Sequence, residues 1–262
     1  MNNTHKSRFL SGFRFKQFTV RQDRCPMKVG TDGVLLGAWA AVRPQDRRML
    51  DIGTGTGLIA LMLAQRALEA HVTGVDIDDV GQARENAAAS PWSGRVAFAQ
   101  CPVQEFETPE PFDLIVSNPP FFVDSLTCPD GGRTRHAVHL PFGDLRDAVL
   151  RLLAPGGRFA VILPTAEAER FLAVCAGRLA LVRRTDVRTT PRRPAKRALM
   201  EFVRADRPAA PPADCSADRP ADPPADCSAA VPEVSELVVG TGEHECYTPE
   251  YRALTRDFYL KF

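Results

Sequence analysis

Short apolar stretches alternate with amphipathic stretches through the centre of the chain. The apolar stretches predict seven strands, at residues 48–52, 71–75, 95–99, 112–116, 158–163, 179–187 and 197–204. The amphipathic stretches predict helices at residues 56–68, 79–89, 142–153 and 166–177. Such alternation predicts an α/β fold in which a mostly parallel, seven-stranded sheet carries helices on both faces.

The pattern stops between about residues 205 and 232, a stretch dense in Pro, Ala and Asp in which PPADCSA occurs twice. This composition buries little apolar surface, so it predicts a disordered insertion. Folded sequence resumes with a predicted strand at 236–239. Thr248 and Pro249 then predict a helix start, with Thr as the cap and Pro in the first turn. The insertion therefore lies inside a domain and does not link two domains.

The net charge is +1, yet two stretches are strongly basic: residues 6–28 and 183–197 each hold seven Lys or Arg against one acid. Local basic stretches on a near-neutral chain suit an anionic partner such as RNA, although a solvated surface gives the same pattern. The seven cysteines form no CxxC pair, which fits a reducing cytosol. The longest apolar run, 34–42, is too short to span a bilayer. We expect a cytoplasmic protein without a membrane or metal partner.

A glycine motif follows the first central strand, where residues 48–57 read RMLDIGTGTG. Gly53, Gly55 and Gly57 stand at a strand-to-helix turn, where glycine lets the backbone approach a ligand. Asp76 ends the next strand, where an acid accepts hydrogen bonds from a ribose. A nicotinamide dinucleotide is the alternative ligand, but the acid Asp51 before the first glycine suits a cationic amino-acid group better than a pyrophosphate. S-adenosylmethionine carries such an ammonium group.

The strand at 112–116 leads into Asn118, Pro119, Pro120 and Phe121. Ligands of open α/β sheets sit beyond the carboxyl ends of the strands, so this segment borders the same pocket. The two prolines restrict the backbone and orient the Asn118 amide and the Pro119 carbonyl. Two such acceptors can each take one N–H of a planar amine and aim its lone pair at a methyl donor. Phe121 can stack on a nucleobase.

With these motifs, the chain resembles the Rossmann-like class I methyltransferases that modify planar amino groups, and more closely the bacterial tRNA1(Val) (adenine37-N6)-methyltransferase family. The resemblance runs nearly end to end; residues 13–40, 193–202 and the tail YTPEYRALTRDFYLKF are its family-specific parts. It implies N6-methylation of an adenine in tRNA, at adenine 37 beside the anticodon of a valine tRNA. It also implies an N-terminal cap, 1–46, that contributes to the cofactor and RNA sites, and a methyltransferase domain, 47–262.

The resemblance carries three sets of residues onto this chain. Those implied to hold the cofactor are Lys28, Gly30, Thr31, Asp32, Asp51, Gly53, Gly55, Gly57, Asp76, Ile77, Cys101 and Asn118. Those implied to hold the target amine and base are Asn118, Pro119, Pro120 and Phe121. Those implied to contact RNA phosphates are Arg133, Arg135, Arg192, Arg193, Lys196 and Arg197.

Two departures from the family pattern concern ligand contacts. Many relatives carry an acid after the third strand for the cofactor's adenine, whereas this chain has Gln100-Cys101-Pro102, so a backbone group or Gln104 would substitute. The aromatic residue after NPP is Phe121, whereas Tyr is commoner among adenine methyltransferases and Phe occurs in guanine-N2 methyltransferases of rRNA.

Three other functions therefore stay open: rRNA guanine-N2 methylation, methylation of a release-factor glutamine, and a catalytically silent RNA-binding module. His136, His139 and Cys128 suggest a metal only weakly, because they lack a further ligand pair. We expect the loop at 122–141 to cover the substrate base and Trp39 and Trp92 to serve in packing. The sequence does not determine the oligomeric state, and we expect a monomer.

Overall fold

The computed structural model describes residues 12–25, 28–120, 140–205, 231–244 and 246–261. Its helices are α1 (Thr31–Trp39), α2 (Leu58–Arg66), α3 (Gly81–Ala88), α4 (Phe142–Leu152), α5 (Thr165–Cys175) and α6 (Pro249–Thr255). Its strands are β1 (Gly12–Arg14), β2 (Thr19–Arg21), β3 (Arg48–Ile52), β4 (His71–Asp76), β5 (Val96–Gln100), β6 (Phe112–Ser117), β7 (Leu153–Pro164), β8 (Leu179–Arg188), β9 (Ala195–Arg204) and β10 (Glu233–Val238). The predicted α/β class is confirmed.

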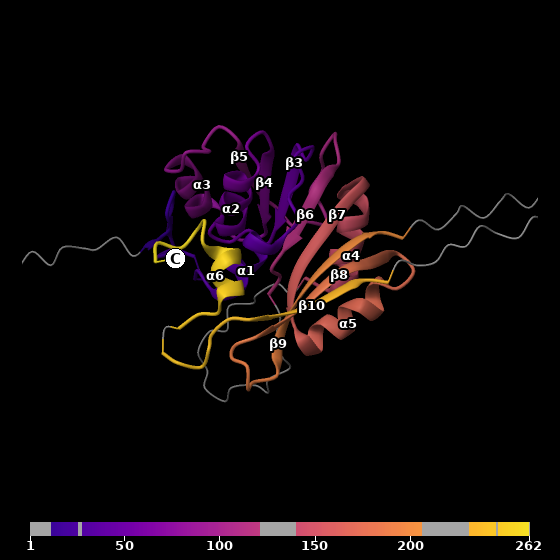
Figure 1. Ribbon diagram of the computed structural model, residues 1–262. Coiled ribbons are helices and arrows are strands. Elements are labelled where there is room, and N and C mark those ends of the chain that lie inside the picture. The colour runs from indigo at the N-terminus through magenta and orange to yellow at the C-terminus, as the bar shows by residue number, and fades with distance from the viewer. Residues whose placement is uncertain (1–11, 26–27, 121–139, 206–230, 245, 262) are drawn as a thin grey trace, which may run out of the picture.

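One sheet organises the described part of the chain, with the strand order β10-β8-β9-β7-β6-β3-β4-β5 (Figure 1). All neighbouring strands are parallel except β9, which runs antiparallel to both β7 and β8. The sheet has eight strands, one more than predicted. The eighth strand is β10, which corresponds to the strand predicted at 236–239 after the insertion and pairs in parallel with β8 at the edge of the sheet.

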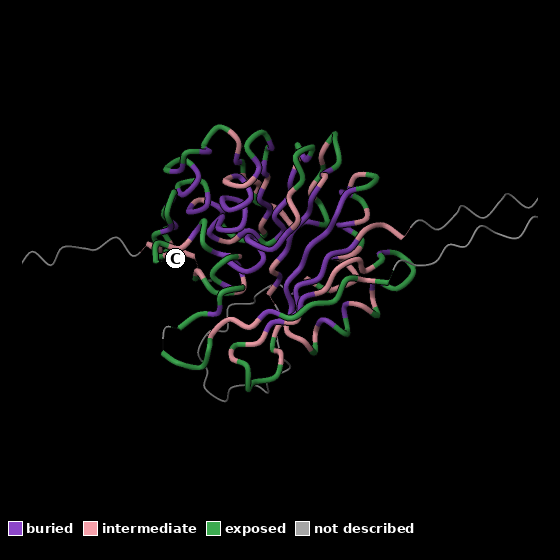
Figure 2. The backbone as a smooth tube through the Cα atoms, viewed as in Figure 1, coloured by how far each residue is buried: buried purple, intermediate pink, exposed green. Residues whose placement is uncertain are grey.

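Helices cover both faces of the sheet, and side chains that alternate along each strand face opposite helical layers. Met49 and Leu114 belong to the core under α1 and α2, whereas their chain neighbours Leu50 and Ile115 belong to the core under α4 and α5. This alternation follows from the pleat of a strand, in which successive side chains point to opposite faces. Figure 2 shows the buried interior running through the sheet and the exposed turns at its edges.

Helix α1 was not predicted, because its sequence TDGVLLGAW has no polar face. Residues Gly33 to Trp39 are all buried, and they pack in the same core as α2. Trp39 and Trp92 are each 8% exposed and sit in this core, so their predicted packing role is confirmed. Beyond α1, the buried Asp46 forms an ion pair with Arg158 of β7 at 2.6 Å, which ties the N-terminal segment to the sheet.

The N-terminal hairpin and the C-terminal tail meet beside α6. The backbone N–H of Lys16 donates to the carbonyl oxygen of Phe258 at 2.8 Å, and Phe15 stacks on both Phe18 and Tyr259. Helix α6 begins as predicted, with the Thr248 hydroxyl accepting from the Tyr251 N–H and Pro249 in the first turn.

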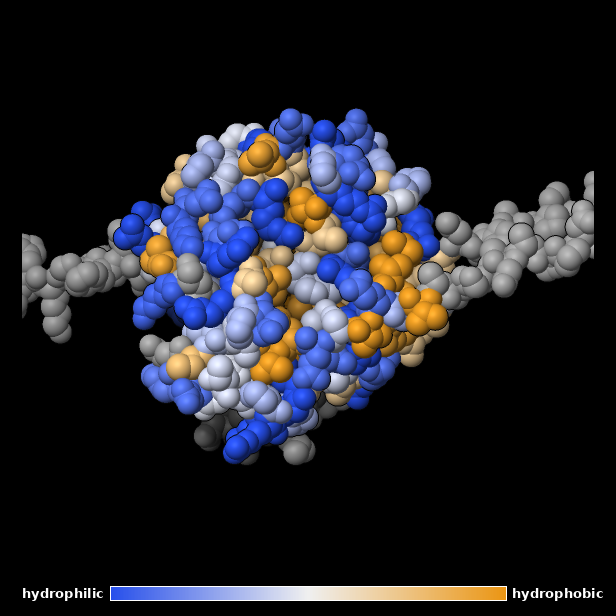
Figure 3. Space-filling view, viewed as in Figure 1, coloured by the Kyte–Doolittle hydropathy of each residue, from blue (hydrophilic) through white to orange (hydrophobic). Residues whose placement is uncertain are grey.

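Two further expectations concern the insertion and a possible membrane segment. Most of the predicted insertion, residues 206–230, lies outside the described residues. Among the described helices, none is long and apolar enough to cross a membrane. Figure 3 shows hydrophilic side chains over much of the visible face and hydrophobic ones gathered over the side that carries β8, β10 and α5.

Candidate functional site at the carboxyl edge of the sheet

The carboxyl ends of β3, β4 and β6 meet at one edge of the sheet. Ile52 is the register partner of both Val75 and Ser117, and the Ser117 hydroxyl donates to the Ile52 carbonyl oxygen at 2.9 Å. The residues that follow these three partners, Gly53, Asp76 and Asn118, therefore leave the sheet side by side. This is the edge at which open α/β sheets bind ligands.

The glycine turn after β3 has the backbone conformation that the motif predicts. Gly53, Gly55 and Gly57 have φ values of +72°, +52° and +80°, a region that side chains disfavour. A Cβ on Gly57 would stand 2.9 Å from Phe98, so this position also lacks room for a side chain. A Cβ on Gly53 would meet nothing within 4 Å, which leaves open space above the turn. The turn is thus shaped for close approach of a ligand to its backbone.

Asp51 lies beneath this turn rather than on its surface, with a fully buried side chain. Its Oδ2 accepts hydrogen bonds from the Thr54 hydroxyl at 2.7 Å and from the Ala60 N–H at 3.2 Å, in the first turn of α2. Its Oδ1 meets no hydrogen-bond donor among the described residues. Burial raises the pKa of Asp51 to about 7. A buried carboxylate oxygen without a donor is costly, and its charge beneath the turn favours the ammonium group of a ligand bound above the turn.

Asp76 and Ile77 form the β4 side of the site. One Asp76 oxygen accepts from the Gly55 N–H at 2.8 Å and the other accepts from the Asp78 N–H at 3.0 Å. Burial is the main cause that raises the pKa of Asp76. Ile77 is 41% exposed, unusual for a large apolar side chain. A carboxylate held by the glycine turn beside an exposed apolar side chain fits a ribose and the face of an attached base.

Asn118 and Pro119 form the β6 side. Asn118 is half-buried, and its side-chain amide makes no hydrogen bond to the described residues. Pro119 is buried and Pro120 half-buried, so the backbone that carries the Pro119 carbonyl is packed in place. The Asn118 amide therefore stays available for a substrate. Phe121 lies outside the described residues, as do residues 122–139 of the loop predicted at 122–141.

The predicted N-terminal ligands lie where the chain enters α1. Lys28, Gly30 and Thr31 are exposed, and the Lys28 ammonium donates to the Gln22 carbonyl oxygen at 3.2 Å. Gly30 caps α1 without a side-chain hydrogen bond. Asp32 forms an ion pair with Arg197 of β9 at 2.7 Å, so a predicted cofactor residue and a predicted RNA residue contact each other.

The residues that follow β5 bring few polar side chains to the site. Cys101 is half-buried, its N–H donates to the Asp76 carbonyl oxygen at 2.9 Å, and burial raises the pKa of its thiol. The Gln104 amide donates to Asp144 at 3.0 Å. The backbone N–H of Cys101 and the Gln104 amide, which would substitute for the family's acid toward the cofactor's adenine, thus already make hydrogen bonds within the protein.

The basic turn between β8 and β9 lies at this same edge. Pro164 at the end of β7 pairs with Arg197, and β8 is antiparallel to β9, so the turn 189–194 follows the carboxyl end of β8. Arg192, Arg193 and Lys196 are exposed there. Neighbouring strands are about 4.8 Å apart, so β9 stands roughly 10 Å from β6 and Asn118. Arg133 and Arg135 lie outside the described residues.

The structure adds two polar side chains of α3 that sequence analysis missed. Asn86, only 1% exposed, accepts from the Arg21 N–H and donates to the carbonyl oxygens of Arg21 and Thr56. Gln82 accepts from the Arg24 N–H and donates to Asp23. Asn86 thus ties β2 to the glycine turn, and Gln82 ties the segment after β2 to α3. The sequence did not indicate that they are buried, because Asn and Gln usually lie on the exposed face of a helix.

The described residues contain no group of three or more potential metal ligands. His136, His139 and Cys128 lie outside the described residues.

Comparison with known proteins points to a single family. A family model described as a methyltransferase domain matches residues 45–190. A tRNA1(Val) (adenine(37)-N6)-methyltransferase of Bacteroides thetaiotaomicron is 42% identical over 95% of this chain and 97% of its own length. The protein of the same name from Phocaeicola vulgatus is 45% identical over the same shares of the two chains.

Solved structures support the fold. A predicted O-methyltransferase of Agrobacterium tumefaciens superposes with a TM-score of 0.60 over 87% of this chain and 96% of its own, at 18% sequence identity. At that identity the likeness concerns the fold alone, and it agrees with a class I methyltransferase architecture.

Proposed function

The chain belongs to the tRNA1(Val) (adenine(37)-N6)-methyltransferase family, and on that premise we propose that the carboxyl edge of its sheet is the catalytic site. The protein is an S-adenosylmethionine-dependent methyltransferase that acts on N6 of an adenine in tRNA. The target we propose is adenine 37 of a valine tRNA, as the relatives' name states, a position beside the anticodon.

The cofactor's polar groups match residues on three sides of this edge. The Asp51 oxygen that lacks a donor suits the ammonium group, and Asp76 suits the ribose hydroxyls. Ile77 supplies an apolar surface for the adenine. The segment that holds Lys28, Gly30, Thr31 and Asp32 borders the methionine end, and Cys101 borders the adenine from β5. We propose that residues 1–46 act in this way as an extension of the domain 47–262.

When bound, the cofactor supplies an electrophilic methyl group on a sulfonium. Asn118 and Pro119 prepare the acceptor nitrogen, since the Asn118 side-chain oxygen and the Pro119 carbonyl each accept one N–H of the adenine amine. Their pull reduces delocalisation of the nitrogen lone pair into the ring and aims it at the methyl group. Both acceptors also stabilise the positive charge that develops on nitrogen, which then releases one proton to water. Pro120 and Phe121 hold the base in place.

The observation that carries this assignment is the register between β3 and β6. Because Ile52 pairs with Ser117, Asn118 lies directly beside the glycine turn, and its amide makes no hydrogen bond to the described residues. Beneath the same turn, the buried Oδ1 of Asp51 meets no donor among the described residues. The basic turn with Arg192, Arg193, Lys196 and Arg197 lies two to three strands away at the same edge. We propose that this turn, together with Arg133 and Arg135, contacts tRNA phosphates, and that the enzyme works as a cytoplasmic monomer without a metal.

A direct test incubates the full chain with S-adenosylmethionine carrying a labelled methyl group. Separate reactions contain total tRNA, rRNA or a release factor, and mass spectrometry identifies the modified residue. We expect N6-methyladenosine in tRNA. Labelled N2-methylguanosine in rRNA, label on a release-factor glutamine, or no label in any substrate would contradict the proposal.

A further inference from the structure

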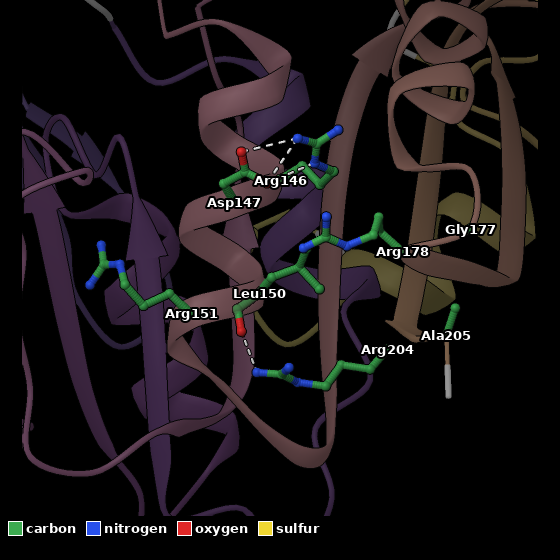
Figure 4. A pocket seen from close by; sticks show the side chains of 8 residues that line it. All are labelled: Arg146, Asp147, Leu150, Arg151, Gly177, Arg178, Arg204 and Ala205. Carbon is green, nitrogen blue, oxygen red and sulfur yellow. Dashed lines mark hydrogen bonds and ion pairs between the residues drawn. The ribbon is translucent and has the colours of Figure 1, made fainter. Parts of the chain in front are cut away.

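A second basic feature lies at the opposite edge of the sheet. Leu179 at the start of β8 pairs with Arg204 at the end of β9, so this edge is the far end of the strands that lead to the basic turn. A hollow of about 850 Å³ opens there between α4, the turn before β8 and the end of β9. Arg146, Arg151, Arg178 and Arg204 line it, with Asp147 as its one acid (Figure 4).

The arginines of this hollow are largely unneutralised. Arg146 is paired with Asp147, whose pKa falls because of the hydrogen bond from that guanidinium. Arg151 donates to the carbonyl oxygens of Phe106, Val103 and Gln104, and Arg204 donates to those of Leu150 and Leu153. Carbonyl oxygens orient a guanidinium without cancelling its charge. The exposed Glu107 lies beyond Arg151 in the adjoining hollow and forms no ion pair among the described residues.

The Arg178 side chain differs from the other three because it donates no hydrogen bond to the described residues. It follows Gly177, whose φ of +71° sets the turn into β8. Its guanidinium makes no hydrogen bond or ion pair to the described residues, although Asp147 lies near enough for the Arg178 charge to lower the pKa of that carboxyl. Figure 4 shows the guanidinium directed into the hollow between Arg146 and Arg204. The Arg178 and Arg204 guanidinium groups thus face the same open space, whereas Arg151 turns away from it toward the carbonyl oxygens of Phe106, Val103 and Gln104. Such a set binds phosphate oxygens at a low entropic cost.

We infer that this hollow, the distal arginine site, binds backbone phosphates of the tRNA at a distance from the methylated base. The inference rests on the proposed function, which supplies a long polyanion as substrate. Strand β9 runs for ten residues between the two edges, which corresponds to about 30 Å at roughly 3.4 Å per residue. Roughly ten base-pair steps of a duplex span this distance. A tRNA whose target base lies at Asn118 therefore reaches the distal arginine site with its body, beyond the anticodon stem and loop.

The test uses Arg178→Ala and Arg178→Glu in the full chain, because the Arg178 side chain makes no hydrogen bond or ion pair to the described residues. Arg170→Ala and Arg170→Glu are matched controls, since Arg170 of α5 is exposed and carries the same charge. We expect the Kd for full-length tRNA to rise severalfold in Arg178→Ala and further in Arg178→Glu. The slope of log affinity against log salt falls by about one in Arg178→Ala, because one cation no longer neutralises a phosphate.

Three comparisons make the outcome decisive. The Kd for an isolated anticodon stem-loop and the kcat at saturating tRNA stay unchanged in the Arg178 variants if the site is distal. Equal tRNA affinity and salt slope in the Arg178 and Arg170 variants would overturn the inference, and so would an equal loss with the stem-loop. Binding of inorganic phosphate that Arg178→Ala abolishes, with tRNA affinity unchanged, would identify a small-anion site instead. Failure of the proposed function is distinguishable from failure of this inference, because the unaltered protein would then form no N6-methyladenosine in tRNA.

Discussion

The side-chain amide of Asn86 donates a hydrogen bond of 2.9 Å to the carbonyl oxygen of Thr56, inside the glycine turn. The same side chain pairs with both backbone groups of Arg21 on β2. One buried asparagine therefore fixes the N-terminal hairpin and the cofactor turn relative to each other.

Replacing Asn86 by Ala leaves these three backbone groups without their partner. Each buried group left unpaired costs about 1–3 kcal/mol, and the costs do not simply add. We expect a lower melting temperature and a KM for S-adenosylmethionine raised about fivefold or more, with a smaller change in kcat. Ala88→Ser, on the exposed side of the same helix, serves as the control. A drop in melting temperature with an unchanged cofactor KM would limit Asn86 to folding.

The buried carboxyl of Asp51 predicts a pH-dependent stability. Its pKa of about 7 in the folded protein lies well above the value of about 3.9 in an unfolded chain. The folded state thus holds the proton more tightly, so Asp51 favours folding at acid pH, and this contribution is lost as the pH rises through about 7. Asp51→Asn lacks this titration. We expect the melting temperature of the variant, relative to the unaltered protein, to rise between about pH 5 and pH 8.

The same titration affects cofactor binding with the opposite sign. Ionised Asp51 attracts an ammonium group, so the affinity for S-adenosylmethionine rises with pH up to about 7 in the unaltered protein. Calorimetric titration measures the affinity of both proteins for the cofactor over this pH range. The difference between the two profiles removes the effect of the cofactor's own ionisation, because that effect is common to both. Parallel pH profiles for the unaltered protein and Asp51→Asn would contradict an electrostatic interaction between Asp51 and the ammonium group.

Ile77 offers a test of the adenine contact that leaves the fold intact. Its side chain is 41% exposed, and its truncation to Ala removes apolar surface that the bound cofactor would cover. We expect a five- to tenfold weaker Kd for S-adenosylmethionine, about 1 kcal/mol, with an unchanged melting temperature. Leu68→Ala is the matched control, because Leu68 is 79% exposed and lies away from the carboxyl edge. Equal affinities for the two variants would remove Ile77 from the cofactor site.

The turn between β8 and β9 predicts a salt-dependent effect on tRNA alone. Arg192 and Lys196 are exposed at the catalytic edge. The double variant Arg192→Ala/Lys196→Ala removes two cations that neutralise phosphates, so the slope of log affinity against log salt falls by about 1.4–1.8. Cofactor affinity stays constant. Binding curves at several salt concentrations measure the slope, and an unaltered slope would place the tRNA elsewhere on the protein.

Sequence patterns predicted the parts of this fold in which local signals agree with tertiary structure. The strand at Arg48–Ile52 and the cap at Thr248 follow from alternation and from turn chemistry, and the structure has both. The glycines of the turn adopt the positive φ values that their residue type permits. Each of these features depends on residues that are close in sequence.

Features that depend on distant contacts escaped prediction. Helix α1 has no polar face because it is buried all round, so it lacked helical periodicity. Strand β7 begins at Leu153, before the strand predicted at 158–163, because pairing with β6 continues past an irregularity between Phe112 and Leu114. The pairing of Asp32 with Arg197 joins residues 165 positions apart, and no local pattern encodes it.

Asn118 gives the most direct test of the central claim, that an asparagine oxygen and a proline carbonyl orient a planar amine for methyl transfer. The measurement quantifies N6-methyladenosine formed in tRNA by Asn118→Ala, alongside calorimetric binding of S-adenosylmethionine. Gln104→Ala, which removes an amide already engaged with Asp144, is the control. We predict that Asn118→Ala still binds the cofactor, because the other residues implied to hold it are unchanged, and loses turnover by roughly a hundredfold or more. Turnover close to that of the unaltered protein would contradict the account.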